Sequence, residues 1–194
     1  MKLAAHRRLL VLAVLCAGLL GLIAGCGSGD EDAPPPPDYA KKLAGSPAPL
    51  AALHEQGNEL LSGGLDAYDK RIESLKGFPV VVNVWASWCG PCRQEFPYFQ
   101  QASANMGKKV AFLGVNAEDA DDLAGDFLAD HPVPYPSYTD PKAEIAGEVG
   151  GVGYPRTVFY DANGKLIQTH SGGFPDQASL DEAIQQYAVE GRSG

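Results

Sequence analysis

The stretch that most constrains this chain is residues 80–97, VVVNVWASWCGPCRQEFP, where an apolar run meets two closely spaced cysteines. Valines and Trp85 dominate the first half, a composition typical of a strand buried on both faces of a sheet. From Arg93 onward the pattern becomes helical. The sequence therefore predicts a strand followed by a helix, with Cys89 and Cys92 at the start of that helix.

Cys89 is expected to be the reactive sulfur, exposed at the helix start. Unpaired backbone N–H groups and the positive end of the helix dipole stabilise a thiolate there and lower its pKa. Cys92 can close a small disulfide ring with it, and a structural disulfide or half of a zinc site is the alternative. The two other cysteines, Cys16 and Cys26, belong to the N-terminal segment. We therefore expect no four-thiolate metal site and no cofactor other than this disulfide.

The N-terminal segment predicts export. Basic residues precede an apolar run from Leu9 to Ile23, the pattern of a signal peptide, which we place at residues 1–25. The sequence LIAGC ending at Cys26 resembles the bacterial lipobox. That resemblance implies a lipidated Cys26 and a location on the extracytoplasmic face of the cell membrane. The alternative is an uncleaved signal anchor, because residues 9–27 are just long enough to span a bilayer.

Residues 26–49 are predicted to form a disordered, Pro-rich tether. Pro34 to Pro37 favour extended polyproline II, and the acidic and small residues around them bury too little apolar surface to fold. Residues 50–194 are long enough for one domain. Without residues 1–25 the chain carries 12 basic and 24 acidic side chains, a net charge of −12. Nucleic acid is therefore not an expected partner.

Periodicity and turn residues predict an α/β domain. Besides the central strand and the helix after it, which should end near Asn105, we expect a second strand over residues 109–115 and a hairpin closed by Asn163-Gly164. The segment over residues 131–138 holds three prolines and should be an edge segment or a loop. Further helices are expected over residues 50–61, 65–75, 123–128, 141–149 and 180–189.

Three motifs together resemble the thioredoxin superfamily. They are WASWCGPCRQEFP, a Tyr154-Pro155 step before the strand RTVFYD, and the NGK hairpin. The resemblance implies a thioredoxin fold, a central mixed sheet covered by helices on both faces, here with extra N-terminal helices. Asn83, Glu95 and the N-terminal segment are similar to those of the membrane-tethered TlpA/ResA group.

Thioredoxins usually carry a buried Asp at the position of Asn83, and that departure makes Glu95 the candidate proton acceptor. Glu95 follows Cys92 by three residues on the same helical face, and burial would raise its pKa toward the range of a proton shuttle. A solvated helix carboxylate is the alternative for Glu95. Trp85 is expected in the core and Trp88 over the disulfide.

The resemblance implies an extracytoplasmic thiol-disulfide oxidoreductase. Cys89 would attack a substrate disulfide and Cys92 would resolve the mixed disulfide. Tyr154-Pro155 would be a cis peptide that pairs with an extended substrate. The residues expected to bind substrate are Trp88, Gly90, Pro91, Tyr154 and Pro155.

The expected partners are protein thiols and disulfides, among them apocytochrome c before haem attachment, and a membrane electron donor. We expect a monomer. The first alternative is an oxidase that forms disulfides in exported proteins. A tethered binding module with a structural disulfide is the second. A peroxidase is less well supported, because neither Cys89 nor Cys92 lies in the Pro-x-x-x-Thr-x-x-Cys pattern that it requires.

Overall fold

The computed structural model describes residues 35–193. The predicted signal peptide and Cys26 lie outside these residues. No helix in the described range is both long and apolar enough to cross a membrane. In chain order the elements are α2 (Tyr39–Leu43), α3 (Ala48–Glu55), β1 (Leu60–Leu61), α4 (Gly64–Ser74), β2 (Val80–Trp85), α5 (Gly90–Met106), β3 (Ala111–Ala117), α6 (Asp121–Asp130), β4 (Ser137–Asp140), α7 (Glu144–Glu148), β5 (Arg156–Tyr160), β6 (Leu166–Ser171), α8 (Gln177–Ala183) and η1 (Ile184–Val189).

The strands form one mixed sheet in the order β1-β4-β3-β2-β5-β6. β2 pairs with β3 in parallel and with β5 in antiparallel orientation, and β5 pairs with β6 as the predicted hairpin. All six residues of β2 are buried. This strand is central, with another strand on either side and helices over both faces, which explains its nearly continuous apolar sequence.

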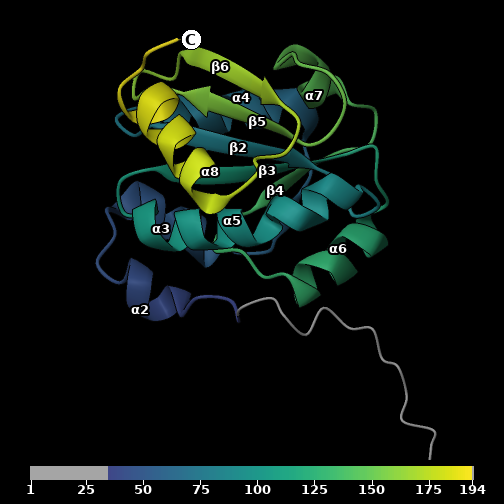
Figure 1. The fold of residues 1–194 in the computed structure, drawn as a ribbon, viewed down its shortest axis with the longest axis horizontal. Coiled ribbons are helices and arrows are strands. Elements are labelled where there is room, and N and C mark those ends of the chain that lie inside the picture. Colours follow the sequence, from purple (N-terminus) through teal and green to yellow (C-terminus); the bar gives the residue numbers. More distant parts are fainter. Residues whose placement is uncertain (1–34, 194) are drawn as a thin grey trace, which may run out of the picture. The chain divides into compact units, whose positions relative to one another are not determined.

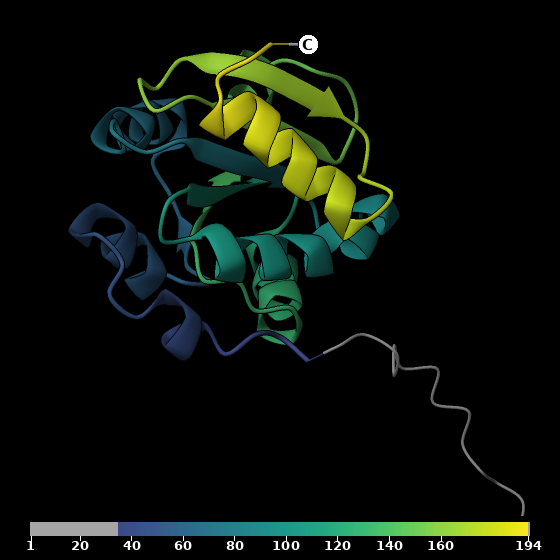
Figure 2. The ribbon, with the colours of Figure 1, turned by 60° about the vertical axis from the view of Figure 1, so that its left-hand side comes forward.

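Helices cover both faces of the sheet. In Figure 1, α5 and α8 lie in front of the sheet, and α4 and α7 lie behind it. Figure 2 shows the sheet between α8 on one side and α4 on the other. Alternate residues of β2 point to opposite faces. Val81 and Trp85 belong to the apolar cluster that includes α5, α6 and α8, and Val82 and Val84 to the cluster that includes α3, α4 and α7.

The N-terminal part of the fold differs from the prediction in two places. The predicted tether ran to Pro49, but α2 and the start of α3 fall within it. These helices are part of the fold because Leu43 is buried and the Tyr39 hydroxyl donates to the carbonyl of Pro132 (2.9 Å). The single helix predicted over residues 50–61 is also wrong. α3 ends at Glu55, and the left-handed backbone of Asn58 (φ 62°) lies in the turn between it and β1.

The Pro-rich segment over residues 131–138 leads into a strand inside the sheet, which the prediction of an edge or loop missed. β4 begins directly after Pro136 and lies between β3 and β1. Proline lacks an N–H donor, but its carbonyl can still accept a hydrogen bond. The Pro136 carbonyl accepts from the N–H of Gly114 (2.9 Å), and the N–H of Ser137 donates to Glu59 (2.9 Å). The prolines therefore precede the strand without weakening it.

The C-terminal helix is longer than predicted and changes its winding. It begins at Gln177 as α8 and continues from Ile184 to Val189 as a π-helix. Asp176 caps its start by accepting from the N–H of Ser179 (2.8 Å). Leu180 and Ile184 are buried against the face of the sheet that α5 also covers.

Gly114 in β3 is expected to tolerate no side chain. A Cβ at this position would lie 2.0 Å from the Ser137 hydroxyl oxygen and 3.1 Å from the indole nitrogen of Trp85. Gly114→Ala should lower the free energy of unfolding by about 1–3 kcal/mol, the usual range for overpacking a core. Urea denaturation measures the change. Gly125→Ala on α6 is the matched control, because its Cβ meets no atom within 4 Å.

Gly125→Ala should be neutral or stabilising, because alanine favours a helix over glycine by about 0.5–1 kcal/mol. Equal stability of Gly114→Ala and the wild type would contradict the close packing of β3 against β4 at this point.

Candidate active site

The two cysteines lie at the start of α5, just after the loop that connects it to β2. Three residues, Ala86 to Trp88, separate the end of β2 from Cys89, which is the N-cap of α5. Cys89 and Cys92 form a disulfide, and the N–H of Cys92 points at the Cys89 sulfur (3.2 Å). A donor in this position stabilises a thiolate on Cys89 once the disulfide is reduced. The predicted strand-to-helix setting of the cysteine pair is confirmed.

Cys89 is buried, contrary to the prediction of an exposed sulfur. Only 4% of its surface is exposed, and Cys92 has none. The N-cap position places the side chain of Cys89 over the first turn of α5 rather than toward solvent, and the disulfide holds it there. The exposed atoms beside the disulfide come instead from Gly90, Pro91 and Trp88. A substrate must therefore reach the sulfur through these neighbours.

The loop before Cys89 is fixed by Asp119. The Asp119 carboxylate accepts from the backbone N–H and the hydroxyl of Ser87, and from the side-chain amide of Asn116 (2.9 Å). This role of Asp119 was not predicted from the sequence. The only sequence signal was its position just beyond the carboxyl end of a predicted buried strand. Functional residues often lie at this end of parallel strands.

The Tyr154-Pro155 step lies at the same end of the sheet as the disulfide, because Arg156, the first residue of β5, pairs with Val84 near the end of β2. The Tyr154-Pro155 peptide bond is cis. A Cβ on Gly173 would lie 3.5 Å from the Glu95 carboxylate, 3.7 Å from Pro155 and 3.8 Å from the carbonyl of Pro91. Gly173 therefore marks the point where the first turn of α5, the cis proline and the chain entering α8 converge. The fold thus brings Pro155 close to Pro91 and Glu95, which lie in α5, far from Pro155 in the sequence.

The two tryptophans take different roles. Trp85 is fully buried, as predicted, and packs against Phe96 and Phe127. Trp88 is 58% exposed and packs edge-on against Tyr154, with the ring centroids 5.9 Å apart. The aromatic surface beside the cysteines thus comes from Trp88 and Tyr154 together.

Glu95 is almost fully buried, with 1% of its surface exposed. One carboxylate oxygen accepts from the N–H of Phe174 (3.1 Å), and within residues 35–193 the other oxygen has no hydrogen-bond partner. Burial raises the pKa of Glu95 to about 7, and the Phe174 N–H opposes this rise. A carboxyl with this pKa can both release and take up a proton near neutral pH.

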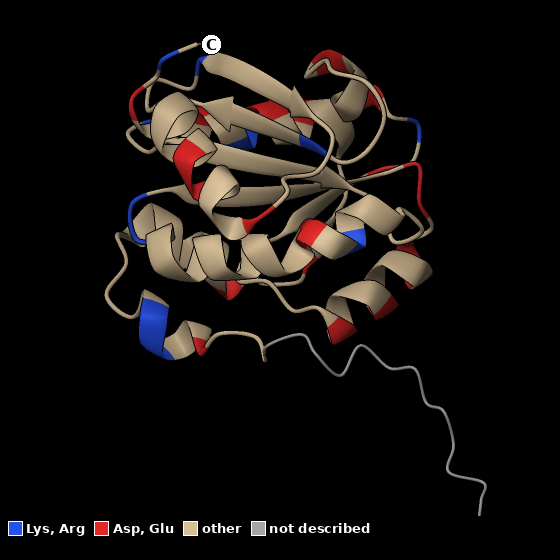
Figure 3. Ribbon diagram, viewed as in Figure 1, with Lys and Arg blue, Asp and Glu red and all other residues tan. Residues whose placement is uncertain are grey.

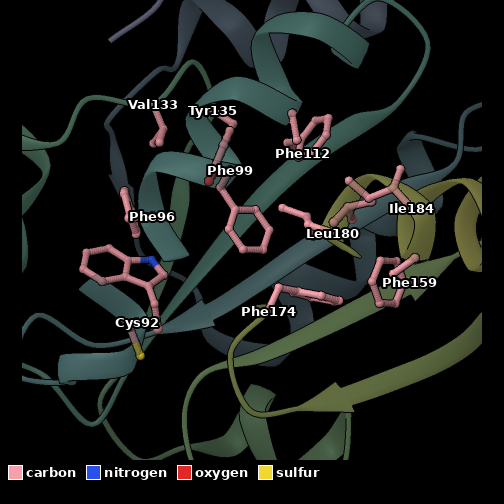
Figure 4. Close-up of a cluster of buried hydrophobic side chains, with 14 of the residues drawn as sticks. Cys92, Phe96, Phe99, Phe112, Val133, Tyr135, Phe159, Phe174, Leu180 and Ile184 are labelled. Atoms are coloured by element: carbon pink, nitrogen blue, oxygen red, sulfur yellow. The ribbon is translucent and has the colours of Figure 1, made fainter. Parts of the chain in front are cut away.

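Further buried polar groups lie on the face of the sheet that α5 covers. Asn83 shares this face with Trp85 and is opposite Thr157 in β5. Figure 4 shows Tyr135 among the aromatic side chains between α5 and the sheet, with Cys92 at one end of the cluster. Burial raises the pKa of Tyr135, and the Tyr39 and Glu95 side chains add to the rise.

None of the polar side-chain atoms of Asn83, Thr157 and Tyr135 has a hydrogen-bond partner in the described part of the chain. Unpaired polar groups in a core cost free energy and are concentrated at functional sites. Sequence reasoning singled out Asn83 but missed Thr157 and Tyr135, because only the strand register and the packing of the segment before β4 place them here.

Residues 43–184 match the model of the Redoxin family. The chain belongs to the Redoxin family. It is 30% identical over 165 residues to the thiol:disulfide interchange protein DsbE of Escherichia coli strain K12, covering 84% of this chain and 82% of that protein. It is also 30% identical over 110 residues to the thiol-disulfide oxidoreductase ResA of Bacillus thuringiensis, covering 55% of this chain and 64% of that protein.

Solved structures of related proteins have the same fold. A crystal structure of a thiol:disulfide interchange protein DsbE from Chlorobium tepidum superimposes with a TM-score of 0.52 at 36% sequence identity, covering 56% of this chain and 79% of that chain. The predicted thioredoxin-like fold is confirmed. The protein is a Redoxin-family thiol-disulfide oxidoreductase, similar to DsbE and ResA, that carries a Cys89–Cys92 disulfide.

Proposed function

We propose that this oxidoreductase reduces disulfides in other proteins outside the cytoplasm. The observation that carries the proposal is the Cys89–Cys92 disulfide at the start of α5, with the cis proline and the buried carboxyl of Glu95 both close to that first turn. This set can attack a disulfide, resolve the product and move the proton that the second step releases. A binding module with a merely structural disulfide would need no buried acid at this point.

The reduced enzyme would act in two exchange steps. The Cys89 thiolate attacks one sulfur of the substrate disulfide, so that a mixed disulfide forms and a substrate thiolate leaves and takes up a proton. Glu95 accepts the proton of Cys92, whose thiolate then attacks the Cys89 sulfur. The second substrate thiolate leaves and is protonated, and the enzyme disulfide closes. The substrate gains two electrons and the dithiol loses two, so a membrane reductant must restore the dithiol.

Tyr154 and Pro155 are the proposed docking edge. The backbone of Tyr154 would pair with an extended substrate strand, a common way for a peptide to bind beside a sheet. Gly90 and Pro91 are exposed next to the disulfide, and the exposed ring of Trp88 adds apolar contact area. These residues would hold the substrate disulfide in reach of Cys89.

We propose apocytochrome c as one substrate. A c-type haem is attached to the two thiols of a Cys-x-x-Cys-His motif, and these thiols must be reduced beforehand. The similarity to DsbE and ResA supports this choice. The predicted signal peptide and the lipobox-like sequence at Cys26 support a lipid-anchored location on the outer face of the cell membrane. An uncleaved anchor would leave the domain on the same side.

The reduction potential of Cys89–Cys92 tests the direction of electron flow. Gly90-Pro91 is the dipeptide of thioredoxin, and the potential should lie near the thioredoxin value of roughly −270 mV. Equilibration with thiol-disulfide buffers, followed by mass analysis of the trapped thiols, measures it. A potential near that of DsbA, roughly −120 mV, would instead assign the protein to the oxidases that form disulfides.

A further inference from the structure

Glu118 links the two aromatic side chains beside the disulfide. It follows directly on β3, in the loop that leads to α6. The indole N–H of Trp88 donates to its backbone carbonyl (2.9 Å), and the hydroxyl of Tyr154 donates to its carboxylate (2.8 Å). Trp88 and Tyr154 pack edge to face. One residue therefore bonds to both rings of the aromatic surface.

The backbone of Glu118 is held in place by its surroundings. Its φ angle of 52° lies in the left-handed region, which is costly for a residue with a Cβ. Its N–H donates to the carbonyl of Asp140 (3.1 Å), and the next residue, Asp119, accepts from Ser87. The position of Glu118 is thus fixed by both the end of β4 and the loop before Cys89.

Tyr154 is restrained on three sides. The guanidinium of Arg156 lies 5.0 Å from the centre of its ring, Trp88 packs against the ring, and Glu118 accepts from its hydroxyl. Burial and the bond to Glu118 raise the pKa of Tyr154 to about 12. Tyr154 immediately precedes the cis proline. The orientation of its ring therefore shapes the surface that a substrate meets.

We propose that Glu118 is a positioning residue for substrate docking, which holds the ring of Tyr154 against Trp88 so that the two form a single surface beside Cys89. The inference deepens the proposed function, because it requires a polypeptide disulfide as substrate. Glu118 acts through the carboxylate oxygen that accepts from Tyr154, and not through the negative charge of the surface around it. That charge comes largely from α6, which carries several acidic residues and no basic one (Figure 3).

Glu118→Ala removes the acceptor and frees the Tyr154 ring. With insulin as the disulfide substrate, KM should rise about 5- to 20-fold, as for the loss of one docking contact, while kcat changes much less. Tyr154→Phe removes the other half of the same hydrogen bond and should raise KM similarly. The KM of the double variant should be no higher than that of the more severe single variant, because the two changes delete the same interaction.

Glu118→Gln separates the hydrogen bond from the charge. Its side-chain carbonyl can still accept from Tyr154, so it should restore most of the KM lost in Glu118→Ala. Asp126→Ala is the matched control, since Asp126 is an exposed acid on α6. It removes one negative charge without touching either ring and should leave KM unchanged. A KM for Glu118→Gln as high as that for Glu118→Ala would overturn the inference, as would an equal effect of Asp126→Ala.

The indole N–H signals give a readout independent of turnover. The chain has two tryptophans, and Trp88→Phe assigns their resonances. Glu118→Ala and Tyr154→Phe should shift or broaden the Trp88 signal, and Glu118→Gln should restore it. The Trp85 indole donates to the buried Ser137 hydroxyl (3.2 Å) and is the internal reference.

A Trp88 signal unmoved in both Glu118→Ala and Tyr154→Phe would contradict the inference. The activity of the wild type toward insulin distinguishes a failure of this inference from a failure of the proposed function. A wild type that does not reduce insulin refutes the function, whereas an active wild type together with an unchanged KM in Glu118→Ala refutes the positioning role alone.

Discussion

Cys92→Ser is expected to stop turnover and to trap the substrate on Cys89. The Cys89 thiolate can still attack a disulfide, but no thiol remains to resolve the mixed disulfide. Loss of a residue that acts as one unit with the nucleophile should lower kcat at least about a thousandfold. Mass spectrometry of the reaction should show an adduct equal to one substrate chain, and a reducing agent should release it.

Cys89→Ser is the matched control for this trapping. It removes the attacking sulfur and leaves Cys92, which is fully buried, so it should show neither turnover nor adduct. An adduct on Cys92 in this variant would reverse the assigned roles of the two cysteines. Normal turnover in either variant would eliminate the dithiol mechanism altogether.

Glu95→Gln is expected to change the pH dependence of the rate. The pKa of Glu95 is raised to about 7 by burial, so its carboxylate becomes available as a proton acceptor when the pH passes through that value. The wild-type rate of the resolving step should rise across this range. Glutamine cannot take up the proton, so the variant should be slower by about 100-fold above pH 7, at the lower end of the range typical of general base catalysis.

The titration of Cys92 provides the decisive comparison. If Glu95 accepts its proton, the thiol of Cys92 in the reduced enzyme should titrate differently in Glu95→Gln, and alkylation rates measured against pH report this. An unchanged rate together with an unchanged Cys92 titration would remove Glu95 from the mechanism and leave it a buried structural carboxyl.

The same substitution should alter stability in a pH-dependent way. Because the folded protein holds the Glu95 proton up to about pH 7 and the unfolded chain releases it at the ordinary value of 4.5, the native state binds more protons between these values. The contribution of Glu95 to stability is therefore fully present below pH 4.5 and is lost as the pH rises through 7. Glu95→Gln avoids this loss.

The free energy of unfolding of the variant, relative to that of the wild type, should therefore be greater at pH 8 than at pH 4.5 by up to about 3 kcal/mol. Urea denaturation of the oxidised proteins at both values measures the change. The Gln side chain can still accept from the N–H of Phe174, so the hydrogen bond is kept. Glu182→Gln, at an exposed position of α8, is the control and should show no such difference.

The local parts of the active site could be predicted from the sequence, and the parts assembled over long distances could not. Residues 80–85 and the helix that starts after Cys89 are encoded by neighbours in the chain, through apolar periodicity and a helix-start signal. β1 has only two residues and forms by pairing with β4, which is distant in the sequence. No local sequence pattern therefore predicts it. The strand character of β4 was likewise hidden by the prolines before it.

The polar groups around the site show the same limit. The sequence did not indicate a role for Glu118, because that role depends on contacts with the side chains of Trp88 and Tyr154, which are distant in the sequence. The burial of Cys89 was missed because helix-start reasoning describes its backbone environment and not what surrounds its sulfur. Asn83 could be singled out only through the family resemblance, whereas Thr157 became visible through the register of β2 and β5.

The unequal outer strands of the sheet have a consequence for solubility. β1 exposes only two residues along one edge, too few to template pairing with another chain, whereas β6 presents six along the other. Leu166, at the start of β6, is partly exposed. Aggregation of this domain should therefore begin at β6, and a lysine or proline placed on the outer side of that strand is the natural point at which to suppress it.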